Sequence, residues 1–426
     1  MSTPPGVVVT GTGVLCSIAA DTTTFSHALR DGVSGVGADP GDGPDRVLRP
    51  RLSARIAGFD LRSAVSRRVE TPGAVRRAAV RVAGRAPLPV QVAVAVALEA
   101  WESAALHRVP LPPDRIGLVV AGHNLGGRYA EQVRPRYAAS PVHLPPRYCL
   151  HFMDTDHVGT VSQVLGITGE GYTVGGASAS GNVAIVNGSR LVTGGAVDVC
   201  LVLGALTDLS GMELQAMYNL GAMAGTRPGD APARRCRPFD AEREGFVPGQ
   251  GAACLVLESA ASAARRRVPA WGRVAGYALG LDGNSLADPS AAGESRVMAQ
   301  AIARAGLVPE QIGYVNAHGT GSVLGDETEV SALRTVFGPG IGRPWLNSTK
   351  GLVGHCLCAA GVVEAVATLA QLRGGFVHPN ANLDRPIDPQ VRFVGARAQP
   401  ADPGYALSNG FGFGGFNSSV VFAGGA

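Results

Sequence analysis

Two histidines and one serine in glycine-bracketed segments are the residues of this chain best suited to chemistry. His318 lies in NAHGTGS, His355 in KGLVGHCLCAAG and Ser178 in GGASASGN. A serine hydroxyl needs a general base within hydrogen-bonding reach, usually a histidine that a third group holds in the right tautomer. The sequence therefore predicts one site in which Ser178, His318 and His355 act together.

The only lysine of the chain lies in the segment of the second histidine. Lys350 stands just before His355, whereas every other basic side chain apart from histidine is arginine. A compact ammonium and a planar guanidinium are not interchangeable, so one lysine in a chain so rich in arginine suggests a specific role. The alternative is a buried ion pair that takes no part in chemistry.

The composition indicates a globular α/β protein. The chain has 426 residues, many of them Ala, Gly, Val and Leu with few aromatics, and a net charge of +4. It is long enough for one large domain or two ordinary ones with a substantial core, and it lacks the short period of fibrous chains. We find no apolar stretch approaching the ~18 to 20 residues of a membrane span. We expect neither a membrane nor a nucleic acid as a partner.

The cysteines favour a reduced, cytoplasmic protein. They are odd in number, scattered and mostly set among apolar residues: Cys16, Cys149, Cys200, Cys236, Cys254, Cys356 and Cys358. Only His355, Cys356 and Cys358 cluster, and because no second ligand pair accompanies them we expect small core residues there and no metal. The N-terminal run GVVVTGTGVLCSIAA lacks the basic segment of a signal peptide, so we interpret it as a strand and a turn.

Strand and helix patterns alternate in both halves, which predicts a mainly parallel sheet architecture covered by helices. We expect strands over 6–10, 116–121, 172–174, 197–203, within 246–258, over 274–279 and 313–316, and two within 405–422. Helices are expected over 22–30, 91–106 and 159–165, from after Ser178 through Ile185 toward Leu191, and over 296–305 and 359–372, with loops over 35–45 and 135–146. Thr10–Gly13 and Gly410–Gly415 contain GxG but lack the context of a dinucleotide site.

Ser178 falls between a predicted strand and a predicted helix. Tyr172–Val174 reads as the strand, Gly-Gly-Ala as an abrupt turn, and the helix follows the serine. A side chain at such an elbow points into a pocket, with the free N–H groups of the helix terminus around it.

Five segments, in order, resemble the β-ketoacyl synthase family of the thiolase superfamily: VVVTGTGVL, CRPFDAEREGFVPGQGAACLVLE, YVNAHGTGSVLGDETE, NSTKGLVGHCLCAAGVVEA and SNGFGFGGFNSSVVF. The resemblance implies a five-layered αβαβα thiolase fold in two pseudo-repeated halves, 1–258 with the serine elbow and 259–426 with both histidines and GFGFGG. It also implies an obligate homodimer or heterodimer, of which we expect the homodimer. It further implies no bound cofactor, and a substrate delivered on the phosphopantetheine arm of an acyl carrier protein.

The resemblance assigns roles to the charged and imidazole side chains. His318 and His355 match the histidines whose N–H groups bind the thioester carbonyl of a malonyl group and promote its decarboxylation. Lys350 matches the lysine behind them, and Glu364 is its expected ion-pair partner.

The resemblance also assigns residues to the walls of the pocket. Thr320 and Ser322 match hydroxyls that hydrogen-bond the pantetheine arm. Phe413 matches the residue whose backbone N–H joins that of the nucleophile in an oxyanion hole, and Phe411 matches the phenylalanine that lines or gates the pocket.

Two positions depart from the family pattern. Gln250 replaces the usual glutamate of GFVxGEG, for which the sequence offers no mechanistic reason, and Ser178 replaces the nucleophilic cysteine. A thiol with a pKa near ~8.5 can be shifted until it attacks as a thiolate, whereas a serine cannot be ionised in that way. Acyl transfer should therefore suffer, while decarboxylation, which depends on the histidines, should survive.

Three functions follow from this pattern. We favour decarboxylation of malonyl-acyl carrier protein to acetyl-acyl carrier protein, because the chain is similar to serine-bearing synthase-like proteins of polyketide β-branching cassettes. The alternatives are a serine-dependent acyltransferase or hydrolase, and a non-catalytic partner akin to a chain-length factor. Both histidines are present, which argues against the non-catalytic reading.

The arginine-rich stretches 46–85 and 265–267 are candidates for recognising an acidic carrier protein. The alternative for both is an ordinary solvated basic face. The other histidines, such as His27, His107 and His378, have no motif around them, and we assign them no role.

Overall fold

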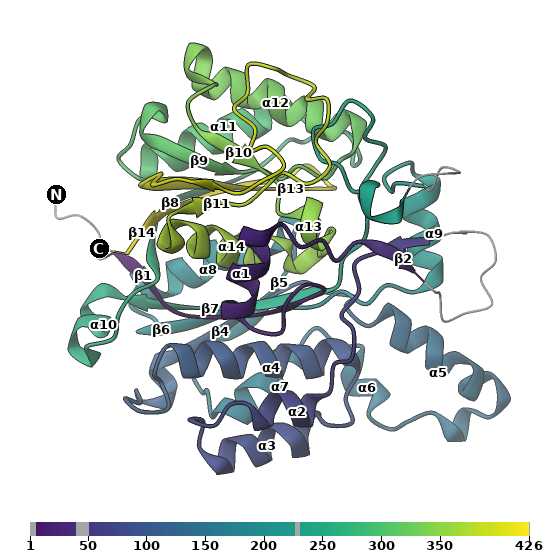
Figure 1. Cartoon of the computed structure of the whole chain (residues 1–426). Helices are drawn as coiled ribbons and strands as arrows, with labels where there is room; N and C mark the ends of the chain where they lie inside the picture. The colour runs from purple at the N-terminus through teal and green to yellow at the C-terminus, as the bar shows by residue number, and fades with distance from the viewer. Residues whose placement is uncertain (1–5, 40–50, 226–230, 426) are drawn as a thin grey trace.

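Two similar sheets lie on either side of a central helical layer in the computed structural model, which describes residues 6–39, 51–225 and 231–425 (Figure 1). The first sheet has the order β5-β4-β6-β7-β1 and the second the order β10-β9-β13-β14-β8. In each, the first three strands pair in parallel, whereas the fourth and fifth pair antiparallel with their neighbours, so the sheets are mixed and not mainly parallel as predicted. The repeated order makes the two halves pseudo-equivalent.

The strands of the first sheet are β1 (Val7–Cys16), β4 (Ile116–Ala121), β5 (Gly171–Val174), β6 (Val199–Gly204) and β7 (Gly251–Ser259). Those of the second are β8 (Gly272–Leu281), β9 (Ile312–Asn316), β10 (Trp345–Asn347), β13 (Tyr405–Gly412) and β14 (Phe416–Gly424). The sheets join where the start of β1 pairs with β8. Two small sheets pair β2 (Gly37–Asp39) with β3 (Arg51–Ser53) and β11 (Phe376–Val377) with β12 (Gln399–Pro400).

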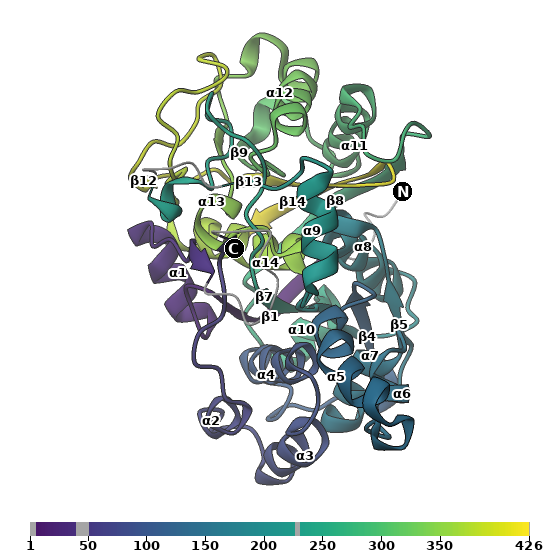
Figure 2. The ribbon, with the colours of Figure 1, turned by 90° about the vertical axis from the view of Figure 1, so that its right-hand side faces the viewer.

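Helices form the other three layers, and Figures 1 and 2 show the same arrangement. The central layer is α8 (Ser180–Thr193) and α14 (Ala360–Gly374), the first sheet is covered by α4 (Leu88–Ser103) and α7 (Asp156–Leu165), and the second by α11 (Ala291–Arg304) and α12 (Val323–Phe337). The remaining helices are α1 (Thr22–Asp31), α2 (Leu61–Ser66), α3 (Gly73–Ala83), α5 (Gly127–Ala139), α6 (Tyr148–His151), α9 (Gly211–Asn219), α10 (Ala260–Arg266) and α13 (Lys350–Val353). The expected five-layered αβαβα thiolase fold is confirmed.

The central helix α14 is buried on all sides because both sheets pack against it. Every residue from Ala360 to Gln371 is buried. The stretch Leu357–Gly374 has the length and hydropathy of a membrane span, contrary to the sequence expectation, and 83% of it is buried inside the protein. A helix that lies between two sheets needs this composition for core packing alone.

Three local predictions were wrong. The run Thr10–Gly13 is not a turn, since β1 continues through it to Cys16 with a bulge after Val9. The expected loop 135–146 begins inside α5, which passes through Pro135 to Ala139. The expected loop 35–45 contains β2, and its part from residue 40 on lies outside the described residues.

The glycines of β1 are explained by close packing against α4. A β-carbon on Gly11 would lie 2.4 Å from the carbonyl oxygen of Ala100, and one on Gly13 would lie 2.2 Å from that of Val96. These glycines let the strand and the helix backbone approach each other, so they serve packing and not a turn.

Gly11→Ala should therefore destabilise the fold by about 1 to 3 kcal/mol through overpacking. Gly37→Ala is the matched control, because nothing lies within 4 Å of its β-carbon position; it should change the free energy of unfolding by no more than about 0.5 kcal/mol. Urea denaturation of both variants measures the difference. Equal stabilities would contradict the packing explanation.

Candidate active site

One cavity of about 490 Å³ collects most of the predicted site residues. Its wall includes Ser178, His318, Thr320, Ser322, His355, Phe411 and Phe413. These side chains come from the elbow before α8, the loop after β9, the turn before α14 and the β13–β14 hairpin. Both pseudo-repeated halves thus contribute to the site.

Ser178 lies in a short 3₁₀ turn, Ala177–Ala179, between β5 and α8. Ala177 has φ 48°, a left-handed conformation that costs a non-glycine residue about 1 to 3 kcal/mol. The Ser180 hydroxyl donates to the Ala177 carbonyl at 2.7 Å and holds the turn. Gly412 packs so closely that a β-carbon there would lie 2.5 Å from the Gly176 carbonyl oxygen. The hairpin motif GFGFGG therefore fits against the serine elbow.

The hydrogen bonds of His355 determine its tautomer. The backbone N–H of Leu357 donates to Nδ1 at 3.1 Å, and Nε2 lies 2.8 Å from Oγ of Ser178. A backbone N–H can only donate, so Nδ1 carries no proton and the neutral ring carries its proton on Nε2. The imidazole therefore donates to the serine hydroxyl and is not positioned as its general base.

His318 is oriented in the same way by Lys350. The lysine ammonium donates to the His318 carbonyl at 2.6 Å and lies 3.5 Å from Nδ1 of the same residue. An ammonium has no acceptor, which leaves the proton of the neutral ring on Nε2. The two rings stand edge to face with centroids 5.7 Å apart. The site thus offers two imidazole N–H donors in one cavity.

Burial, and next the charge of Lys350, hold the pKa values of His318 and His355 well below the usual range. Both rings are therefore neutral at pH 7. Lys350 also forms the expected contact with Glu364, a carboxyl whose pKa is raised by burial to about 7. Both members of this pair are fully buried behind the histidines.

Glu329 was not assigned a role from the sequence. Its carboxylate accepts the backbone N–H groups of His318 at 2.9 Å and Gly319 at 2.8 Å, and the Asn409 side chain at 3.0 Å. It fixes the loop that carries His318. Its place at the end of the segment YVNAHGTGSVLGDETE is the only sequence signal for it.

The remaining predicted residues occupy different depths of the cavity. The Thr320 hydroxyl donates to that of Ser322 at 3.0 Å on the wall. Phe411 is 7% exposed, and its ring centroid lies 5.6 Å from that of His318. Phe413 is 44% exposed. The inner phenylalanine therefore shields a histidine, while the outer one faces solvent.

Gln250 has a structural explanation that the sequence did not offer. Its side-chain amide donates to a carboxylate oxygen of Asp208 at 3.2 Å and accepts the backbone N–H of Ile56 at 3.1 Å. A glutamate in this place would bring two carboxylates within hydrogen-bonding distance. The amide removes that repulsion.

The cysteines beside His355 pack in different places. Cys356 is buried in the core that also contains Cys16, whereas Cys358 lines the cavity. In the described part of the chain, no group of three His, Cys, Asp or Glu side chains could hold a metal ion.

Comparison with known families settles the relationship of this chain. The model described as beta-ketoacyl synthase, N-terminal domain, matches residues 5–263, and that of the C-terminal domain matches residues 271–384. The chain belongs to the β-ketoacyl synthase family. This confirms the resemblance found in the sequence.

Relatives within the β-ketoacyl synthase family span nearly the whole chain. The polyketide biosynthesis malonyl-ACP decarboxylase PksF of Bacillus subtilis (strain 168) is 39% identical over 98% of this chain and 96% of its own. The chloroplastic 3-oxoacyl-[acyl-carrier-protein] synthase I of Hordeum vulgare is 31% identical over 98% of this chain and 88% of its own. A β-ketoacyl synthase structure from Burkholderia phymatum STM815 matches with a TM-score of 0.86 at 28% identity, over 99% of both chains.

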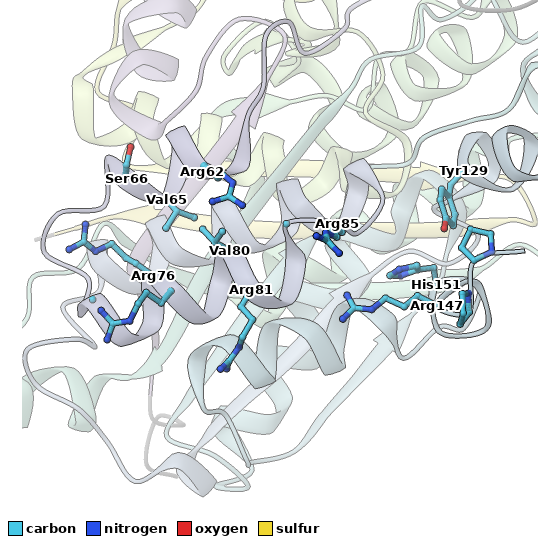
Figure 3. Close-up of a pocket in the computed structure, with 15 residues that line it drawn as sticks. Arg62, Val65, Ser66, Arg76, Val80, Arg81, Arg85, Tyr129, Arg147 and His151 are labelled. Atoms are coloured by element: carbon cyan, nitrogen blue, oxygen red, sulfur yellow. The ribbon is translucent and has the colours of Figure 1, made fainter. Parts of the chain in front are cut away.

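A second cavity, of about 890 Å³, is lined by arginines of α2, α3 and the segments that follow α3 and precede α6 (Figure 3). We call it the arginine cleft, and its basic residues are Arg62, Arg76, Arg77, Arg81, Arg85 and Arg147. Among the described residues, none of these guanidinium groups forms an ion pair with a carboxylate. The cleft therefore has uncompensated positive charge.

Removing the buried ion pair should raise the pKa values of both histidines. In the double variant Lys350→Met, Glu364→Gln, the cation that disfavours imidazolium is gone, and neither member of the pair is left buried without its partner. We expect His318 and His355 to titrate well below ~6.5 in the parent protein and closer to that value in the variant. Histidine-ring NMR titration measures both midpoints. Midpoints unchanged by the double substitution would contradict this account of the low pKa values.

Proposed function

We propose that the protein decarboxylates malonyl-acyl carrier protein to acetyl-acyl carrier protein and carbon dioxide, in polyketide β-branching. The observation that carries the proposal is the donor beside Nδ1 of each histidine, which leaves each neutral imidazole with its proton on Nε2, next to a serine. The relation to PksF, named a polyketide biosynthesis malonyl-ACP decarboxylase, supports it.

Two N–H donors suit the developing charge of this reaction. When the bond between Cα and the carboxylate breaks, its electron pair moves onto the thioester and forms an enolate. His318 and His355 donate to the enolate oxygen, and each such donor is worth roughly 10² to 10³ in rate. Neutral rings are needed throughout, and burial together with Lys350 keeps them neutral.

The serine argues against condensation. Acyl transfer would require a base to take the proton of Ser178, but His355 already has its own proton on the nitrogen that faces the hydroxyl. An acyltransferase or hydrolase would need the opposite tautomer, which the N–H of Leu357 disfavours. The geometry thus supports decarboxylation over the serine-dependent alternative.

The substrate is proposed to enter on a phosphopantetheine arm. Thr320 and Ser322 offer hydroxyls on the cavity wall. Leu220, Leu286 and Leu324 line the same cavity and are more than half exposed. A cavity lined by hydroxyl groups and exposed leucines suits a flexible arm that is apolar in places and carries amide groups.

Purified protein should convert malonyl-carrier protein to acetyl-carrier protein, seen by intact-protein mass spectrometry as a loss of about 44 Da, the mass of carbon dioxide, from the carrier. His318→Ala or His355→Ala should each reduce the rate about 10²-fold or more if both donate to the enolate oxygen. His143→Ala, an exposed histidine outside the cavity, is the control.

An acyl group that accumulates on Ser178 while the carrier keeps its carboxylate would favour the acyltransferase instead. Variants of either histidine with parent activity would contradict the proposed role of the imidazoles.

The arginine cleft is the proposed contact for the carrier (Figure 3). Two arginines of the stretches predicted to recognise the carrier already have carboxylate partners within the protein. Arg266 is buried against Glu258, and Arg68 lies between Glu99 and Glu102. Residues 46 to 50 of the arginine-rich stretch lie outside the described residues. Arg76 to Arg85 spread along α3 and just beyond it, as a row of carboxylates on an acidic partner would require.

Arg77→Glu with Arg81→Glu should weaken the apparent affinity for the carrier at least about tenfold at low salt, by reversing charge in the contact. The difference should shrink as salt screens charges over roughly 10 Å at 0.1 M. Arg397→Glu, an exposed arginine outside the cleft, is the matched control. A carrier affinity that neither the double variant nor salt changes would remove the cleft from the proposal.

A further inference from the structure

A decarboxylase of the kind proposed above must place a proton on the carbon that carbon dioxide leaves. In a condensing synthase the enolate carbon instead forms a bond to an acyl group. Because Ser178 is a poor acyl carrier, the enolate in this cavity needs a proton donor. The inference below rests on the proposed function.

The hydroxyl proton of Ser178 is free to move. Oγ accepts a hydrogen bond from Nε2–H of His355 at 2.8 Å, so its own proton is not used in that contact. Within the described chain, His355 is the only hydrogen-bonding partner of this oxygen. The hydroxyl also lines the cavity, so its proton is available to a bound substrate.

The same histidine places the serine near the reacting carbon. In the proposed complex, the thioester oxygen takes the position that receives Nε2–H of both His318 and His355. The enolate carbon is two bonds from that oxygen. Since Oγ of Ser178 is within hydrogen-bonding distance of the same nitrogen, the proposed complex brings it close to that carbon.

We propose that Ser178 is the proton donor to the enolate. The bond between Cα and the carboxylate breaks, its electron pair enters the enolate, and carbon dioxide leaves. The Oγ proton then forms the new C–H bond, and the alkoxide takes a proton from water. The whole reaction consumes one solvent proton. As the enolate oxygen becomes a neutral carbonyl, the N–H of His355 returns to Oγ and stabilises the transient alkoxide.

Of the other acidic groups on the cavity wall, we consider two as rival donors. Cys358 occupies the turn before α14 that is pseudo-equivalent to the serine elbow, since Leu357 has φ 52° where Ala177 has φ 48°. Glu294 is 1% exposed and has one oxygen without a partner. No hydrogen bond joins either to His318 or His355 in the described structure, whereas Ser178 has one.

The test is the stereochemistry of the new methyl group. Malonyl-carrier protein with deuterium at one methylene position is decarboxylated in tritiated water, and the released acetate is analysed for methyl chirality. A fixed donor adds the triton to one face of the planar enolate, so the parent protein should give one configuration. Ser178→Ala should give a racemic methyl group while carbon dioxide release keeps at least about a tenth of its rate, because cleavage depends on the histidines.

Cys358→Ala and Glu294→Gln are the matched controls and should preserve the configuration of the parent product. Racemic product from the parent, or an unchanged configuration from Ser178→Ala, would overturn the proposal. So would racemisation by either control, or loss of carbon dioxide release in folded Ser178→Ala, which would indicate a covalent role. If the parent releases no carbon dioxide from malonyl-carrier protein, the proposed function itself fails.

Discussion

The hydrogen bond from the Leu357 backbone to Nδ1 of His355 determines what this cavity can do. A backbone amide cannot accept a proton, so it commits the neutral imidazole to donate from its other nitrogen. Lys350 imposes the same orientation on His318. The pseudo-repeat brings the serine and the histidine together, because each central helix starts after a turn with a left-handed residue. The turn before α8 carries Ser178, and the turn before α14 contains the Leu357 amide that fixes the tautomer of His355.

Burying the ion pair behind the histidines costs free energy, and contacts within the site compensate for that cost. Moving an ammonium and a carboxylate out of water is unfavourable unless contacts of good geometry compensate for it. Lys350 has them in Glu364 and in the carbonyl of His318. Burial of the rings, and next the charge of Lys350, keep the imidazoles neutral, since imidazolium out of water and beside a buried cation is disfavoured. We infer that the only lysine of the chain serves the electrostatics of the site as well as its packing.

The sequence motifs predict residues that line one cavity, but not how these residues contact one another. Ser178, His318 and His355 were identified from their sequence motifs. The apolar strand β4 was predicted with its observed bounds. What failed depends on contacts between distant segments. The glycines of β1 are explained only by α4, and Gln250 only by Asp208 and Ile56. The role of Glu329 likewise follows from the folded loop that it caps. A tautomer depends on which groups surround a ring, and no periodicity in a sequence encodes them.

Neutron diffraction from crystals of the perdeuterated protein at neutral pH observes the proton positions on the two imidazoles directly. The proposed mechanism requires deuterium on Nε2 of both His318 and His355, none on Nδ1 of either, and the Ser178 deuteron directed away from His355. Deuterium on Nδ1 of His355, with the Ser178 deuteron pointing at an unprotonated Nε2, would contradict it. That arrangement would make His355 the general base of a nucleophilic serine.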